Sequence, residues 1–281
     1  MKTWKKIVLG VSLISLFLGG GLVAWGYSQG GLTDLQNKTI SEQDYVKKEV
    51  KDFNKIDIKS SSYNVLIKNG DVDKATLSYY QKTKNPIDTS VKDGQLTIND
   101  NNSELDSTSN KHINFFGLKD LVRLSTLNKE VRNKTIVITL PKKQTIDFLK
   151  VDLATGNLDL SNSTIKQADI NLNVGDLTFT KMIVSNLKAN LDVGSVDSDH
   201  TLFTNSDLSI AMGDYSGDNL IFNGHNKLDV TSGDIEIVLK DYTLNVQADS
   251  HSGEVDITNN LKISKDNTLT ITSDLGDITV E

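Results

Sequence analysis

The carboxyl-terminal half of the chain alternates between apolar and polar residues in short runs, and each run surrounds a glycine. The apolar residues lie five and three positions before the glycine and two positions after it, as Val151, Leu153 and Leu158 do around Gly156. Asp, Asn, Ser and Thr occupy most of the positions between them. One apolar and one polar face is typical of a half-buried β-strand. The pattern therefore predicts strands that turn at each glycine.

The glycine-centred pattern recurs seven times at nearly constant spacing. The glycines are Gly156, Gly175, Gly194, Gly213, Gly233, Gly253 and Gly276, and successive ones are 19, 19, 19, 20, 20 and 23 residues apart. A period of this size predicts a solenoid, because coils stacked about 4.8 Å apart turn each apolar position into a continuous buried column. We expect each glycine at a turn where a side chain would clash or where φ is positive. An antiparallel sandwich does not explain the period.

A third apolar position lies about ten residues before most of these glycines and predicts a third side for each coil. It is occupied by Ile165, Val184, Phe203, Phe222 and Leu244. The sequence therefore predicts an all-β protein, with a parallel β-solenoid of about 19–20-residue coils over residues 144–281.

Residues 51–143 show less regular β patterns, with an insertion at 99–134. Within the insertion, 113–131 combine dense apolar residues with Lys and Arg, and the spacing of Leu118, Leu121 and Val122 is helical. The apolar residues are Ile113, Phe115, Phe116, Leu118, Leu121, Val122, Leu124, Leu127 and Val131. Two interpretations stay open: a basic amphipathic element that faces a membrane or a partner, or a cap over the open end of the solenoid core.

The amino-terminal residues predict a membrane anchor. Residues 1–6 carry three Lys and form a cytoplasmic region, and 7–27 run for 21 residues without a charge. At 1.5 Å per residue this run spans about 31 Å as a helix, close to the thickness of a bilayer core. A cleaved signal peptide is the alternative, but no clear Ala-x-Ala site follows. We expect a transmembrane anchor at 7–27, a tether at 28–50 and an extracellular carboxyl-terminal domain on the cell membrane.

Charge and composition exclude several classes of protein. The net charge is −7, and residues 144–281 hold 22 acidic and 8 basic side chains. An acidic balance argues against binding a phosphate backbone, so we expect no nucleic-acid partner. The chain has no Cys, which excludes disulfides, Cys-ligated metals and a Cys nucleophile. No cofactor is predicted.

The acidic residues next to the repeat glycines are the candidates for chemistry. Asp176, Asp214, Asp234 and Glu254 each follow a glycine directly and share one column of the predicted solenoid. Their expected role is to hydrogen-bond the turn amides, and uptake of Ca²⁺ or Mg²⁺ by stacked carboxylates is the alternative. The one Gly-x-Ser-x-Gly sequence, at 26–30, overlaps the end of the predicted anchor and does not lie at a strand-to-helix turn. We therefore predict no catalytic residues and no enzyme.

Four motifs precede the glycine repeats in a fixed order. They are Phe53-Asn-Lys-Ile56-Asp-Ile58, Asn64-Val65-Leu-Ile67-Lys-Asn-Gly70-Asp71, Asp93-Gly94-Gln-Leu96-Thr-Ile98 and Ile138-Thr-Leu140-Pro141. With the repeats, this order resembles the bacterial adhesin-like β-strand repeat family, a domain of unknown function, over roughly residues 53–281. The resemblance implies a membrane-anchored envelope protein, and some members are encoded beside cell-wall stress signalling systems. The family pattern contains no catalytic residues, and the 99–134 insertion departs from it.

These observations favour a non-enzymatic protein of the cell envelope. We expect a binding or accessory role between the membrane and the cell wall, with an envelope protein or a cell-wall polymer as partner and a link to the envelope stress response. A surface adhesin for a host or neighbouring cell is one alternative. A polysaccharide-active β-helix enzyme is the other.

Overall fold

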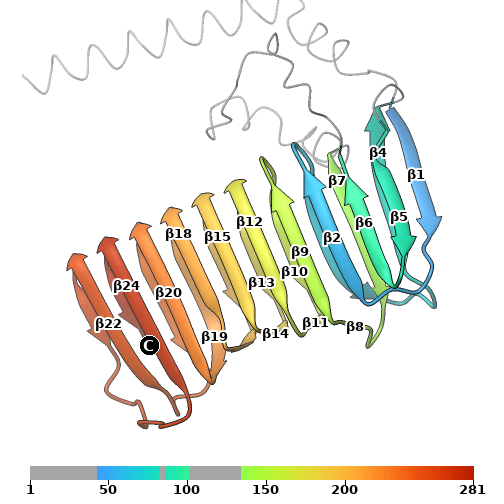
Figure 1. Cartoon of the computed structure of the whole chain (residues 1–281). Helices are drawn as coiled ribbons and strands as arrows, with labels where there is room; N and C mark the ends of the chain where they lie inside the picture. The colour runs from blue at the N-terminus through green and yellow to red at the C-terminus, as the bar shows by residue number, and fades with distance from the viewer. Residues whose placement is uncertain (1–42, 83–85, 101–133) are drawn as a thin grey trace, which may run out of the picture. The chain divides into compact units, whose positions relative to one another are not determined.

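The computed structural model describes residues 43–82, 86–100 and 134–281 (Figure 1). These residues form β-strands and no helix, so the predicted all-β class is confirmed. In this part of the chain no helix is long and apolar enough to cross a membrane. The anchor predicted at 7–27 and most of the 99–134 insertion lie outside the described residues.

The repeats form coils with two or three walls, which we call the long, middle and short walls. The long wall contains β9 (Phe148–Leu153), β12 (Ala168–Val174), β15 (Leu187–Val193), β18 (Asp207–Met212), β20 (His225–Ser232), β22 (Asn245–Ser252) and β24 (Thr268–Leu275). The middle wall contains β10 (Leu158–Ser161), β13 (Leu177–Thr180), β16 (Val196–Asp199), β19 (Tyr215–Asn223), β21 (Ile235–Leu239), β23 (Val255–Ile257) and β25 (Ile278–Val280). The short wall contains β8 (Thr145–Ile146), β11 (Thr164–Ile165), β14 (Ile183–Ser185), β17 (Leu202–Thr204) and the last residues of β19.

The walls are parallel sheets in which equivalent residues of successive coils are partners. In the long wall Ile170 pairs with Ala189, and Ala189 pairs with Leu208. All three side chains are buried and belong to one apolar core that runs through the stack. The parallel solenoid is therefore confirmed, and its physical basis is the 19–20-residue period, which places like residues above one another.

The amino-terminal β region continues the same walls. The strands are β2 (Lys55–Ser60), β3 (Asn64–Gly70), β6 (Gln95–Asn99) and β7 (Thr135–Pro141). β2 pairs with β9 and β6 in the long wall, and β3 pairs with β10 and β7 in the middle wall, always in parallel. The sequence placed a boundary between 143 and 144, but the structure shows no break in the sheets there. Two further coils therefore precede the glycine repeats. Their apolar columns continue those of the repeats.

The stack of coils ends differently at its two ends. At the amino-terminal end β5 (Asp88–Lys92) and β4 (Thr76–Lys82) pair antiparallel with β6 and β7, and β1 (Gln43–Glu49) follows β4. The sequence predicted a tether over 28–50, so the strand at Gln43–Glu49 is a correction. Val46 of β1 packs against the core, and the Tyr45 ring lies 4.9 Å from that of Tyr80. Its Lys residues mark it as an edge strand.

At the carboxyl-terminal end the coils do not follow sequence order. β24, from the last repeat, pairs with β20 on one side and with β22 on the other. β25 likewise lies between β21 and β23. The last repeat is therefore inserted between the fifth and the sixth, and Figure 1 shows β24 between β20 and β22. The sequence analysis assumed consecutive stacking. The sixth repeat carries more polar residues at its inward positions, such as Ser250, and is suited to the exposed end.

Candidate binding surface

The glycine corner joins the long wall to the middle wall, and its geometry explains why glycine recurs. A Cβ built on Gly175, Gly194 or Gly213 would lie 2.0, 1.9 or 2.1 Å from the carbonyl oxygen of the glycine one coil earlier. Their φ angles are 150°, 149° and 141°, a region that L side chains rarely adopt. These glycines lie at the corner between two strands, where the sequence predicts turns. For Gly253 the close approach alone applies, with Gly276 as the neighbour at 2.0 Å.

The residues after the glycines, together with Asn64 after Tyr63, form a hydrogen-bonded ladder, which we call the corner ladder. Its members in spatial order are Asn64, Asn157, Asp176, Ser195, Asp214, Asp234, Asp277 and Glu254. In every step a side-chain oxygen accepts from the backbone N–H of the next member, at 2.8–3.3 Å. The ladder thus joins coil to coil along the corner, in the order that the inserted last repeat requires.

The four predicted cation candidates all belong to the corner ladder, but only two of them are adjacent. Asp214 and Asp234 are neighbours, whereas Ser195 separates Asp176 from them and Asp277 separates Glu254 from Asp234. One carboxylate oxygen of each aspartate accepts the next amide. The structure therefore gives these aspartates the expected turn role, and cation binding stays a prediction.

The middle wall adds another acidic group near the same corner. Asp159 lies on β10, and its carboxyl is partly buried. Burial, with a smaller contribution from the Asp176 carboxylate, raises the pKa of Asp159, although a hydrogen bond with Thr178 opposes the rise. The corner is therefore a region of negative potential that favours positive partners.

An exposed apolar column runs beside the corner ladder. It is formed by the residue immediately before each glycine. Val174, Val193 and Met212 are partners in successive coils, Ser232 follows, and then Leu275. The four apolar residues are 45%, 44%, 58% and 56% exposed. We call Val174, Val193, Met212 and Leu275 the corner stripe. Single exposed apolar residues are common, but four aligned along one edge form a surface that can dock a partner.

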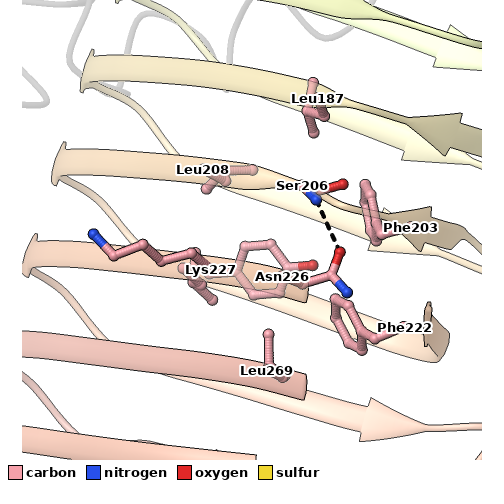
Figure 2. Close-up of a pocket in the computed structure, with 10 residues that line it drawn as sticks. Leu187, Phe203, Ser206, Leu208, Phe222, Asn226, Lys227 and Leu269 are labelled. Carbon is pink, nitrogen blue, oxygen red and sulfur yellow. Dashed lines mark hydrogen bonds between the residues drawn. The ribbon is translucent and has the colours of Figure 1, made fainter. Parts of the chain in front are cut away.

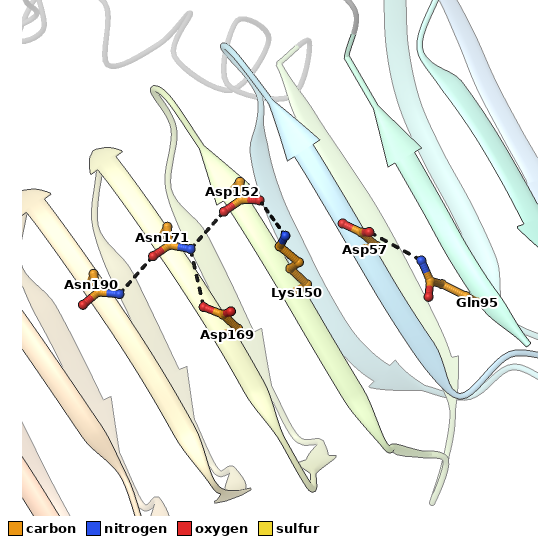
Figure 3. A network of polar contacts seen from close by, with 7 residues as sticks. All are labelled: Asp57, Gln95, Lys150, Asp152, Asp169, Asn171 and Asn190. Carbon is orange, nitrogen blue, oxygen red and sulfur yellow. Dashed lines mark hydrogen bonds and ion pairs between the residues drawn. The ribbon is translucent and has the colours of Figure 1, made fainter.

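The outer face of the long wall is polar and ordered in two columns. One column alternates in charge from coil to coil: Asp57, Lys150, Asp169, Lys188, Asp207 and Lys227. Opposite charges directly across parallel strands stabilise the pairing. In the other column Asn190 donates to Asn171, and Asn171 donates to Asp152, both at 2.9 Å (Figure 3). The sequence analysis noted polar outward positions and did not recognise this charge alternation, which the 19-residue period could have revealed.

A polar groove lies on the long wall near the amino-terminal coils. Its volume is about 610 Å³. It is lined by Lys59, Ser60, Ser61, Asn99, Asp100, Asp152, Leu153, Ala154, Asn171 and Asn173. Asp100 is 7% exposed, and its Oδ2 accepts from both Ser61 Oγ at 2.9 Å and Ser60 Oγ at 3.2 Å. The groove thus presents hydrogen-bond donors and acceptors on a rigid sheet.

A small, partly open pocket reaches the core where the apolar column of the long wall is interrupted by Ser206 and Asn226 (Figure 2). The Asn226 side chain accepts from the Ser206 backbone N–H at 3.0 Å and donates to the Asn223 carbonyl at 2.9 Å. Phe203 and Phe222 line the pocket, whose volume is about 20 Å³. This space suits a single water molecule and is far too small for a lipid chain.

One group of side chains in the described residues has ligand atoms close enough for a metal ion. The ligand atoms of Asp199, His200 and Asp218 lie within 4.8 Å of one another. His200 Nδ1 is 2.6 Å from Asp199 Oδ1, and both side chains are about half exposed. Asp218 follows Asp199 by one period, so the period could have indicated that they are neighbours.

The comparison with protein families decides the classification. The Toastrack DUF4097 family model matches residues 53–281. The chain belongs to this family. The resemblance carried by the ordered motifs is thereby confirmed. No functionally curated protein matches the sequence.

Several solved bacterial structures are similar to this chain at low identity. A candidate adhesin from Bacteroides fragilis is 16% identical with a TM-score of 0.39, covering 86% of this chain and 98% of its own. A candidate cell adhesion protein from Clostridium sporogenes is 17% identical with a TM-score of 0.32, covering 85% and 99%. A candidate lipid-binding protein from Parabacteroides distasonis is 12% identical with a TM-score of 0.35, covering 85% and 97%.

Proposed function

We propose that this protein is a non-enzymatic envelope protein that binds a cell-wall polymer through the polar groove of the long wall. The observation that carries the proposal is the groove itself, about 610 Å³ in volume and lined by Lys, Asn, Ser and Asp side chains. A parallel sheet repeats such groups about every 4.8 Å. A polymer with repeating polar groups can therefore form similar polar contacts with successive coils.

The proposal includes a location between the membrane and the wall. The uncharged run at 7–27 supports a membrane anchor, and Lys near the amino terminus favours a cytoplasmic start. Only 28–42 separate that run from β1, which begins at Gln43. Fifteen residues reach at most about 50 Å, so the solenoid stays near the membrane surface. A link to the envelope stress response rests on the family resemblance and is part of the proposal.

The binding test uses the full-length protein in detergent micelles and insoluble cell-wall sacculi, with and without their anionic polymers. We expect the protein to sediment with the sacculi. The double variant Lys59→Ala/Asn171→Ala should bind about tenfold more weakly, which corresponds to about 1.4 kcal/mol. The control Lys240→Ala/Asn260→Ala removes the same side-chain types from exposed positions outside the groove.

Four outcomes would contradict parts of the proposal. If the wild type does not sediment with any wall fraction, the polymer is not the ligand. Equal binding by the groove and control variants would place the contact elsewhere. Soluble glycan fragments released during incubation would favour the polysaccharide-active enzyme. Extraction of the protein from membranes by alkaline carbonate would contradict the anchor.

A further inference from the structure

The corner stripe is an exposed apolar surface that the groove hypothesis does not use. Val174, Val193 and Met212 lie in three successive strands of the long wall, β12, β15 and β18. They cover about 10 Å along the stack at about 4.8 Å per strand. Covering these side chains removes exposed apolar surface from water, so an occupant of the stripe would be stabilised.

The insertion at 101–133 starts and ends at this corner. It leaves the end of β6, where the Asp100 N–H donates to the Lys59 carbonyl. It returns at Lys134, whose carbonyl accepts from the N–H of Asn64, the first member of the corner ladder. In this outer coil the insertion therefore takes the place that a glycine turn takes in the repeats. Its two ends lie on the same edge of the stack as the corner stripe.

The length of the insertion fits the distance along the edge. β12 is the third strand after β6 in the long wall, and β18 is the fifth, so Val174 and Met212 lie about 14 and 24 Å along the stack. If 113–131 is helical, as its spacing predicts, it is about 28 Å long. Residues 101–112 span up to about 40 Å when extended, which is enough to reach the far end of the stripe. The chain can then return along the stripe to Lys134.

Charge and chemistry also match. The segment 113–132 carries Lys119, Arg123, Lys129 and Arg132 among its apolar residues. The corner stripe is flanked by exposed acidic residues, among them Asp176, Asp192 and Asp214. An apolar segment with basic residues complements an apolar edge with acidic neighbours. The same acidic neighbours would repel an anionic lipid surface.

The interpretation of this segment as an end cap stays a prediction, but both ends of the stack have edge strands of their own. At the amino-terminal end β5 covers the edge of β6, and β4 covers the edge of β7. The sixth repeat forms the other end. The apolar residues of 113–131 therefore have another surface available, and it is the corner stripe.

We propose that segment 113–131 of this chain docks along the corner stripe and buries Val174, Val193 and Met212. This contact would hold the insertion on the glycine corner, beside the groove that includes Asn99 and Asp100. It stands independently of the identity of the groove's ligand, because it rests on the stripe, the ends of the insertion and the charges.

Disulfide trapping tests the contact directly, because the native chain has no Cys. Leu121→Cys is combined in the full-length protein with Val174→Cys, Val193→Cys or Met212→Cys, each pair in a separate variant. The matched control combines Leu121→Cys with Ile183→Cys, which is 48% exposed on the short wall. We expect an intramolecular disulfide, identified by peptide mass spectrometry, in at least one stripe pair and not in the control.

Oxidation of Met212 gives a second readout that does not require new cysteines. Met212 is 58% exposed, whereas Met182 is 1% exposed and serves as an internal reference for folding. In the variant Phe115→Ser/Phe116→Ser/Leu118→Ser, hydrogen peroxide should oxidise Met212 about tenfold faster if the docked form is about 90% populated in the wild type. Met182 should stay protected in both proteins.

Other results would overturn the proposal. Equal trapping of the stripe and control pairs, or no trapping of any stripe pair, would show that 113–131 does not dock there. Disulfides that form only between molecules would assign the stripe to a second copy of the chain. If the triple variant oxidises Met212 at the same rate as the wild type, the segment does not cover the stripe.

Discussion

Val255 and Ile278 are partners on adjacent parallel strands, and the residue that comes later in the sequence is the one inside the stack. Ile278 is fully buried, while Val255 is 38% exposed. Ile278 also pairs with Ile235 on its other side, so β25 has a neighbour on both edges. The last repeat of the chain therefore completes the interior of the solenoid, and the sixth repeat forms its end.

This order predicts unequal effects of two chemically similar substitutions. Ile278→Ala should lower the free energy of unfolding by about 2–4 kcal/mol, because it leaves a cavity between two coils. Val255→Ala should lower it by less than about 1 kcal/mol, because the side chain is already partly in solvent. Urea denaturation followed by circular dichroism measures both. If the coils stacked in sequence order, Val255→Ala would be the more harmful change.

The glycine corner predicts strong destabilisation by a single methyl group. Gly194→Ala would place Cβ 1.9 Å from the Gly175 carbonyl oxygen at a φ of 149°. The coils must separate to relieve this clash, so we expect a loss of about 3 kcal/mol or more in the free energy of unfolding. The control Ser195→Ala changes the next residue and should cost about 1 kcal/mol or less. Similar unfolding midpoints for the two variants would contradict the role of the glycine.

The corner ladder predicts that Asn replaces Asp without loss of structure. The Asn157 side-chain oxygen already accepts from the Asp176 backbone N–H at 3.0 Å. Asp176→Asn should therefore change the stability by less than about 0.5 kcal/mol, whereas Asp176→Ala loses the bond to the Ser195 amide and should cost about 1 kcal/mol. Thermal unfolding of both variants measures the difference. Equal losses would show that the acceptor does not matter.

The cation hypothesis can be separated from this turn role. We expect millimolar Ca²⁺ or Mg²⁺ to raise the melting temperature more than NaCl of equal ionic strength, because the folded column holds carboxylates together. The variant Asp176→Asn/Asp214→Asn/Asp234→Asn should lose this excess and keep its fold. A cation effect that persists in the triple variant and disappears in His200→Ala would assign binding to the group around Asp199 instead.

Tyr63 predicts a loss of stability at alkaline pH. Burial, followed by the nearby Asp100 carboxylate and Tyr79, raises the pKa of the Tyr63 phenol to about 12. The unfolded chain then releases this proton near pH 10 while the folded protein keeps it, so stability is unchanged below pH 10 and falls as pH rises toward 12. The expected loss is about 2–3 kcal/mol. Urea denaturation at pH 9 and pH 11.5 should show a smaller fall in Tyr63→Phe, and an equal fall would contradict the assignment.

The sequence by itself determined the repeated unit of this protein. The constant glycine spacing and the apolar positions around each glycine were enough to predict parallel coils with three sides, since like residues must stack to bury their apolar faces. The turn role of Asp176 and its equivalents also followed, because short polar side chains satisfy turn amides. These features are local and repeat in every coil, so one coil predicts the others.

The tertiary structure alone decided which coils are neighbours and which side chains meet between them. The insertion of the last repeat between the fifth and sixth depends on contacts over 43 residues, such as the hydrogen bond from the Asp277 amide to Asp234. The same is true of the groove, which joins Asp100 to Asn171 across four coils. The repeats are nearly interchangeable in pattern, so periodicity cannot rank their pairings. Packing of buried residues such as Ile278 against both neighbours selects the order.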